Sequence, residues 1–312
     1  MGRSPKKRGR DISGIFVLDK PAGMSSNQVL QRVKRIFNAN KAGHTGNLDV
    51  PATGLLPICL GEATKVSAYL LNSDKIYRAR CKLGVTTTTG DAAGEVLGTN
   101  TVPEINESIL TTVLQKFKGE IEQVPPMYSA LKHNGKRLYE LAYQGIEVER
   151  KPRKITIHHI ELIESSGDEF EIQVHCSKGT YIRTLAQDIG EELACGAHIL
   201  TLRRLGSGPF QEKQMMTLSQ LEQLAKDDFE QLDELLLPMD TALADFPEVR
   251  LDEHVAHYLC QGQAVVAPGL PNEGWLRIYN DSDQFIGLGM VTGDGRVAPK
   301  RLINIPETGL AG

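Results

Sequence analysis

A single carboxylate, Asp49, lies in a loop with three glycines that runs from Gly43 to Gly54. This Asp49 loop (residues 43–54) also contains one histidine, two threonines and one proline. Glycine has no side chain to obstruct a ligand, so the backbone can approach one closely here. A carboxylate held in this way can attack a substrate or move a proton. Because a largely apolar run at residues 55–60 follows directly, we expect Asp49 to lie on the floor of a cleft.

An ordinary turn is the alternative interpretation of the Asp49 loop, since glycine and aspartate are common in turns. The familiar phosphate-binding loops are excluded, because the chain has no G-x-x-x-x-G-K-S/T motif and no G-x-G-x-x-G motif after a strand. The composition of the loop alone therefore leaves the turn and the functional site both open.

Other segments of the chain add to the pattern of the Asp49 loop. They occur at residues 19–26, 75–77, 125–132, 176–184 and 202–205. Their sequences and their order resemble the TruB family of tRNA pseudouridine synthases, in which the aspartate of a G-H-T-G-x-L-D segment is catalytic. The C-terminal segment is similar to a PUA RNA-binding domain. The resemblance covers nearly the whole chain and implies isomerisation of uridine 55 in the TΨC loop of tRNA.

The resemblance also implies roles for individual side chains. Asp49 is expected to be the catalytic carboxylate, and Arg183 its fixed cationic partner. Arginine does not deprotonate and can hold a carboxylate through two parallel hydrogen bonds, which lysine would not reproduce. The target uridine lies inside a folded loop and must be flipped out to be reached. Tyr77 is expected to stack on the flipped base and to help remove the proton from carbon 5.

Three further positions are implied as substrate-binding residues. His44 would fill the gap left by the flipped base or support its stack, while Tyr181 and the backbone of Leu202 would hold the edge of the base. Taken singly, a tyrosine near a strand end usually belongs to the core. Taken together with the Asp49 loop, these residues favour a site.

The expected reaction detaches uracil from its ribose, turns it and rejoins it through carbon 5. It involves no redox change and consumes no phosphate, so we expect no cofactor and no metal. The first step stays open between attack on the base, attack on the sugar and proton abstraction. One rival is a non-catalytic RNA-binding or tRNA-folding protein on the same scaffold. Another is a glycoside or nucleoside hydrolase, which usually needs two facing carboxylates, whereas only Asp49 is identified here.

Three departures from the family pattern are visible. Val50 follows Asp49 where the family usually has proline, and Pro51 comes next. The backbone restriction that proline imposes is therefore shifted by one residue. The segment at residues 87–91 replaces T-D-T-x-D and keeps only its second aspartate, Asp91. Tyr143 follows an alanine where arginine is common, which predicts the loss of one RNA contact.

Composition sets the general class of the protein. A hydrophobic fraction of 40% is enough for a real core. No apolar run approaches the roughly 18 to 20 residues of a membrane span, so we expect a soluble, cytoplasmic protein without a membrane partner. The five cysteines are scattered and never in C-x-x-C spacing, which favours reduced thiols over disulfides or a zinc site. We expect a monomer with no obligatory protein partner.

The charge distribution is uneven although the net charge is −4. Acidic residues gather between positions 227 and 234. Cationic residues form a basic N-terminal arm at residues 1–10 and three internal clusters, at residues 132–137, 150–154 and 203–204. Separated patches of this kind allow a protein that is acidic overall to hold a phosphate backbone.

Periodicity predicts an α+β catalytic domain over residues 11–248, with a mixed, largely antiparallel sheet and an RNA-gripping insertion at about residues 125–151. Strands are expected at residues 14–18, 75–83, 155–163, 170–176 and 197–205. Helices are expected at residues 27–37, 63–71, 105–117, 180–193 and 218–237. From about Val249 a short helix and brief strands between glycines predict a small β-barrel, PUA-like and RNA-binding, over residues 249–312.

Overall fold

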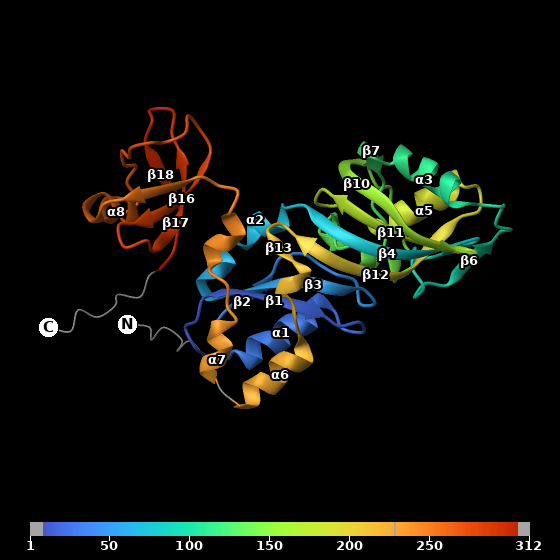
Figure 1. Ribbon diagram of the computed structural model, residues 1–312, viewed down its shortest axis with the longest axis horizontal. Helices are drawn as coiled ribbons and strands as arrows, with labels where there is room; N and C mark the ends of the chain where they lie inside the picture. The colour runs from blue at the N-terminus through green and yellow to red at the C-terminus, as the bar shows by residue number, and fades with distance from the viewer. Residues whose placement is uncertain (1–8, 228, 305–312) are drawn as a thin grey trace.

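The computed structural model describes residues 9–227 and 229–304, in which a large sheet and a separate C-terminal sheet organise the chain (Figure 1). The large sheet follows the order β14-β1-β3-β12-β4-β11-β10-β7, with β2 on β3 and β13 on β12. Its strands are β1 (Gly14–Lys20), β2 (Ala42–His44), β3 (Thr53–Leu60), β4 (Lys75–Leu83), β7 (Gly119–Gln123), β10 (Arg153–Ser166), β11 (Glu169–Cys176), β12 (Ala197–Ser207), β13 (Phe210–Gln211) and β14 (Met216–Thr217). Only the pairs β1–β14 and β3–β12 of this sheet are parallel. The predicted mixed, largely antiparallel sheet is confirmed.

Helices lie in separate groups around the large sheet, and the last of those described packs on the C-terminal sheet (Figure 1). They are α1 (Ser26–Ile36), α2 (Ser67–Leu71), α3 (Glu107–Lys116), α4 (Leu138–Ala142), α5 (Ile182–Glu192), α6 (Leu218–Asp227), α7 (Phe229–Glu234) and α8 (Glu253–Cys260), with the 3₁₀ helices η1 (Gly61–Lys65), η2 (Glu212–Gln214) and η3 (Met239–Leu243). The single helix predicted over residues 218–237 is wrong. The chain leaves the helical path after α7 because Leu237 exchanges two backbone hydrogen bonds with Ile15, each of 2.9 Å, at the edge of β1.

Strands β1 and β3 are buried on both faces, and side chains alternate between two cores. Phe16 and Leu18 pack with α1 and α6, whereas Ile15 and Val17 pack on the opposite face with α2 and η3. Helix α1 begins with a capping box, in which Ser25 accepts from the Gln28 amide. The Asp49 loop connects β2 to β3, and the pairing of these two strands holds both of its ends.

Strands β4 and β11 bury one face only. Ala79 and Cys81 of β4 lie in the core beneath α3 and α5. The intervening Arg80 is exposed and pairs with Glu169 of β11 at 2.7 Å. This alternation fixes the register of β4, and it places the start of β4 beside the start of α5.

The C-terminal sheet lies apart from the large one and has its own core with α8 (Figure 1). Its strands, in spatial order, are β15 (Glu248–Leu251), β16 (Trp275–Asn280), β17 (Phe285–Val291) and β18 (Val297–Leu302). Val265 adds an antiparallel bridge to Val297. The expected α+β class with a separate small C-terminal sheet is confirmed, while its PUA-like character and the boundary at 249 stay predictions.

Aromatic and polar contacts join the C-terminal sheet to the rest of the chain. The Trp275 ring lies 5.4 Å from that of Tyr69, at the edge-on angle that aromatic pairs prefer. Lys65 donates to the Leu302 carbonyl oxygen at 2.8 Å, and the Asn304 amide donates to Glu62 at 2.8 Å. The C-terminal sheet is therefore docked on α2 and η1.

Two short hairpins complete the fold. They are β5 (Val85–Thr87) with β6 (Val96–Thr99), and β8 (Lys132–His133) with β9 (Lys136–Arg137). The second lies in the predicted insertion, next to α4. Of the predicted basic arm, residues 1–8 lie outside the described part of the chain. Among the helices of that part, none has the length and apolar character needed to cross a membrane.

Candidate active site

A cavity of about 240 Å³ opens where the Asp49 loop, β4, α5, β12 and the insertion meet. Five of the predicted site residues line this Asp49 cavity: Asp49, Tyr77, Tyr181, Arg183 and Leu202. His44, at the end of β2, is not part of the lining. Burial and the charge of Arg204 lower the pKa of His44.

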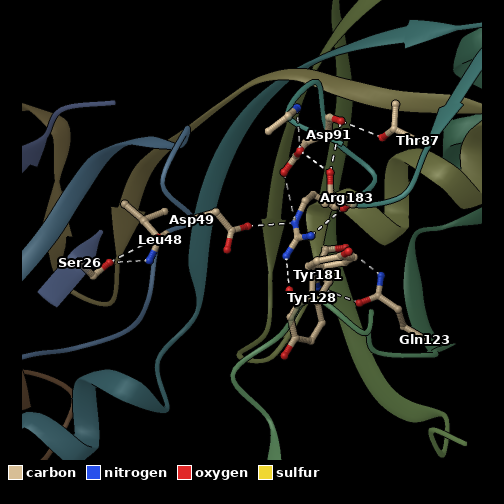
Figure 2. A network of polar contacts seen from close by, with 11 residues as sticks. Ser26, Leu48, Asp49, Thr87, Asp91, Gln123, Tyr128, Tyr181 and Arg183 are labelled. Carbon is tan, nitrogen blue, oxygen red and sulfur yellow. Dashed lines mark hydrogen bonds and ion pairs between the residues drawn. The ribbon is translucent and has the colours of Figure 1, made fainter. Parts of the chain in front are cut away.

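Asp49 and Arg183 form an ion pair at the cavity, with 2.9 Å between Oδ2 and Nε (Figure 2). The Arg183 side chain is 6% exposed and that of Asp49 is 44% exposed. The two terminal nitrogens of Arg183 donate to the carbonyl oxygens of Thr89 and Tyr128, at 2.7 and 2.8 Å. The expected two parallel bonds to the carboxylate are not formed, because these carbonyls occupy the terminal nitrogens. Arg183 is thereby fixed from three sides.

A second carboxylate faces the same guanidinium. Asp91 Oδ2 lies 4.0 Å from Arg183 Nε (Figure 2). The other oxygen of Asp91 accepts from the Thr89 hydroxyl at 2.6 Å and from the Ala93 amide at 3.0 Å. Asp91 is the aspartate that the divergent segment at residues 87–91 retains, so the sequence singled it out without giving it a role.

The Asp49 loop is held by two buried side chains that sequence reasoning missed. The Ser26 hydroxyl bonds both backbone groups of Leu48, and the ammonium of Lys20 donates to the carbonyl oxygens of Ala52, Pro21 and Val50 at 2.7, 3.0 and 3.3 Å. Burial lowers the pKa of Lys20 to about 8. Both residues lie in the segment at 19–26 that carries the family resemblance, and this was the only signal available.

Gly54 allows the Asp49 loop to meet β12. Its φ is +99°, and a Cβ at this position would lie 2.3 Å from the carbonyl oxygen of Arg204. No other residue type fits so close an approach. The parallel pairing of Gly54 with Arg204 therefore depends on the last glycine of the loop.

The two predicted tyrosines lie at the ends of elements. Tyr77 is near the start of β4, and burial raises its pKa. Tyr181 precedes α5; its amide donates to Gln123 at 2.8 Å, and Gln123 donates back to the Tyr181 carbonyl oxygen at 3.1 Å. Leu202 pairs with Ala79 across β12 and β4.

The predicted cationic cluster at Arg203 and Arg204 is not an exposed patch. The two side chains point to opposite faces of β12, as successive residues of a strand do. Arg203 is bound to Asp19 at 2.9 Å and to Glu212 at 3.0 Å. Arg204 is only 1% exposed and lines the Asp49 cavity.

Comparison with known proteins identifies the family of the chain. The profile of the TruB family pseudouridylate synthase N-terminal domain matches residues 34–182. Profiles of a tRNA pseudouridylate synthase B C-terminal domain and of the C-terminal part of pseudouridine synthase II TruB match residues 183–244 and 247–303. The tRNA pseudouridine synthase B of Nitrosococcus oceani is 55% identical over 97% of this chain and 98% of its own. The chain belongs to the TruB family.

Other TruB relatives match a similar share of the chain. The Coxiella burnetii tRNA pseudouridine synthase B is 51% identical over 96% of this chain and 97% of its own, and the Yersinia pestis enzyme is 52% identical over 97% and 95%. The predicted enzyme class, a pseudouridine synthase, is confirmed.

Solved structures share the fold. A Cbf5-Nop10-Gar1 complex gives a TM-score of 0.73 at 29% identity, covering 93% of this chain and 84% of that chain. An H/ACA RNP bound to a substrate RNA containing 2'-deoxyuridine gives 0.72 at 25% identity, covering 98% and 92%. The likeness extends over both the large sheet and the C-terminal sheet.

Proposed function

We propose that this TruB protein isomerises uridine 55 in the TΨC loop of tRNA to pseudouridine, with Asp49 as the catalytic carboxylate. Relatives that span nearly the whole chain are named tRNA pseudouridine synthase B, which supports tRNA as the substrate. The observation that carries the proposal is the ion pair of Asp49 with the buried Arg183 at the edge of the Asp49 cavity.

The ion pair leaves part of the carboxylate available. Arg183 contacts Oδ2 of Asp49, and within the described residues Oδ1 has no hydrogen-bond or ion-pair partner. An oriented carboxylate with one unpaired oxygen suits attack on a substrate or transfer of its proton. The ion pair itself fixes the direction of the carboxylate, because every nitrogen of Arg183 is bound.

The cavity suits a flipped pyrimidine. Tyr77 and Tyr181 supply aromatic lining, and Leu202 adds backbone polar groups. Single-stranded bases are bound by stacking on aromatic side chains and by hydrogen bonds to their edges. In this proposal Tyr77 stacks on the base, Tyr181 and Leu202 hold its edge, and His44 fills the gap left in the RNA.

Further parts of the chain are proposed to hold the rest of the tRNA. The insertion at residues 125–151 would grip the stem-loop, and the PUA-like region from residue 249 would bind outside the modified arm. The similar Cbf5 structures are complexes with Nop10, in one case also with Gar1. For this chain we propose a cytoplasmic monomer that needs no protein partner.

The test is incubation of a tRNA transcript with the full-length protein, followed by chemical mapping of pseudouridine and by mass measurement. We expect one pseudouridine, at position 55, with no change in mass. A transcript with cytidine at position 55 is the control and should gain none. Release of free uracil would identify a hydrolase, binding without conversion would identify a non-catalytic RNA-binding protein, and conversion at another position would overturn the proposed target.

A further inference from the structure

Arg204 is a buried cation without a carboxylate partner. Its Nε donates to the Leu55 carbonyl oxygen at 2.6 Å, and its Nη1 lies 3.4 Å from the carbonyl oxygen of Asn47. Within the described residues, no Asp or Glu lies within ion-pair distance of Arg204, and its buried Nη2 has no hydrogen-bond partner. Buried charges in proteins are ordinarily paired, so this exception indicates a role beyond packing.

The other cationic side chains that line the Asp49 cavity have ion-pair or hydrogen-bond partners. Arg183 is bound to Asp49 and to two carbonyl oxygens. The Lys75 ammonium donates to the carbonyl oxygens of Leu70, Leu71 and Ser73 at the end of α2. Among the lining cations, Arg204 alone combines full burial with a nitrogen that has no partner.

Strand register puts Arg204 against Tyr77. The two residues are direct cross-strand partners in the antiparallel pair of β12 and β4. Directly opposed residues point to the same face, with their Cβ atoms about 5 Å apart. Both side chains line the Asp49 cavity, and the buried Nη2 of Arg204 has a proton available for the Tyr77 oxygen. Arginine only donates, so in a bond between the two side chains the tyrosine oxygen accepts and the hydroxyl proton points elsewhere.

We propose that Arg204 is a positioning residue for Tyr77, and that it stabilises negative charge on the tyrosine oxygen while the carbon-5 proton is removed. This inference rests on the proposed function. After the base has rejoined the ribose, the C5–H bond breaks and its electron pair re-forms the double bond between carbons 5 and 6. The electron pair of the C6=N1 double bond moves to N1, which takes a proton from water. The hydroxyl proton of Tyr77 passes to water ahead of the arrival of the carbon-5 proton, so negative charge develops on the oxygen before that proton binds to it. One proton is lost from carbon 5 and one is gained by N1, so the step balances.

The other charged groups around Tyr77 show why a cation is needed there. Burial raises the pKa of Tyr77, and the Cys176 and Asp49 groups act in the same direction. The charge of Arg204 acts in the opposite direction. A donor already in place at the site of developing charge needs no reorganisation during the reaction.

The test is a double-mutant cycle on a stem-loop that carries uridine tritiated at carbon 5, with tritium release measured in single turnover. Arg204→Lys keeps the charge and loses the planar donor. We expect it to lower the rate by about 10²-fold, as the loss of one preorganised donor does, with binding of the stem-loop unchanged. Tyr77→Phe should be at least as slow. The double variant should be no slower than Tyr77→Phe, because Arg204 acts through that hydroxyl.

Arg203→Lys is the matched control, since Arg203 is the neighbouring arginine on the opposite face of β12 and contacts Asp19. It should match the wild type. Arg204→Gln, which keeps one donor for Leu55, is measured beside Arg204→Lys so that a folding defect in one variant does not decide the outcome. Deuterium at carbon 5 should slow both Arg204 variants more than the wild type, which a purely structural defect would not produce.

Two results would overturn the inference. One is a wild-type rate in the Arg204 variants; the other is a further loss in the double variant equal to that of Arg204→Lys alone, which would mean that Arg204 acts independently of Tyr77. Failure of the proposed function is distinguishable, because the wild type and Arg203→Lys would then release no tritium.

Discussion

The Ser26 hydroxyl binds both backbone polar groups of Leu48, the residue immediately before Asp49 (Figure 2). The Leu48 amide donates to Oγ at 2.9 Å, and the hydroxyl donates to the Leu48 carbonyl oxygen at 3.1 Å. Ser26 is buried at the first residue of α1. The position of the proposed catalytic carboxylate therefore depends on a helix that precedes it in the chain.

Replacing Ser26 by alanine should lower both stability and turnover. Two buried backbone groups of Leu48 would lose their partner, at about 1–3 kcal/mol for an unsatisfied buried group. Thermal unfolding and single-turnover rates measure the two effects. Ser25→Ala is the control, because it removes the N-cap of the same helix, worth about 1 kcal/mol, without touching the loop. Equal rates in the two variants would show that Ser26 does not position Asp49.

Asp49→Asn should abolish turnover and leave tRNA binding intact. The carboxylate is 44% exposed, and Arg183 would keep Asp91 and two carbonyl oxygens, so the loss of stability should be only about 1 kcal/mol. Chemical mapping of pseudouridine and denaturant unfolding measure the two quantities. Asp168→Asn, at a partly exposed pair with Lys82, is the control. Substantial turnover by Asp49→Asn would remove this residue from the centre of the mechanism.

Lys20 should make stability rise with pH above neutrality. Burial lowers its pKa from 10.5 to about 8 in the folded protein, so between these values the unfolded chain binds more protons. Stability then increases as pH rises, by about 2 kcal/mol between pH 8 and pH 10. Lys20→Met should lack this increase relative to the wild type, while Lys82→Met, at a partly exposed position, should retain it. Parallel pH profiles for the wild type and Lys20→Met would contradict the assignment.

Removal of the chain from residue 249 onward should weaken binding of whole tRNA more than it slows modification of an isolated stem-loop. Lost phosphate contacts should also make log affinity less dependent on log salt. Because Tyr69 would lose its contact with Trp275, we expect the truncated protein to melt at a lower temperature. Affinity is measured at several salt concentrations, with the full chain as reference. Unchanged affinity and slope would mean that the C-terminal sheet is a structural element only.

Local periodicity predicted the elements that carry their own pattern. The strand expected at residues 75–83 matches β4. It could be predicted because Ala79 and Cys81 alternate with exposed arginines. The placement of Arg183 beside Asp49 followed from the family resemblance, which matched short motifs in order. The 3.6-residue pattern at residues 218–237 did not reveal the break before Leu237, since a backbone pair with Ile15 causes it.

The residues that sequence reasoning missed act through contacts between distant parts of the chain. The sequence predicted that Arg204 belongs to a cationic surface cluster with Arg203. Only the placement of β12 between β3 and β4 shows that Arg204 is buried. The residues around Gln123 form no recognisable motif, yet its side chain, at the end of β7, forms hydrogen bonds with both backbone groups of Tyr181. Neither contact leaves a periodic signal, because each depends on which strands are neighbours in the sheet.

The parallel pairing of β3 with β12 also has a consequence for biosynthesis. Arg204 binds the carbonyl oxygen of Leu55, which leaves the ribosome 149 residues earlier. At roughly 5–20 residues per second, the Asp49 loop would wait on the order of 10 to 30 s for this partner to be synthesised. A nascent chain therefore carries the aspartate long before it can carry a working site, which keeps the unfinished protein from acting on RNA.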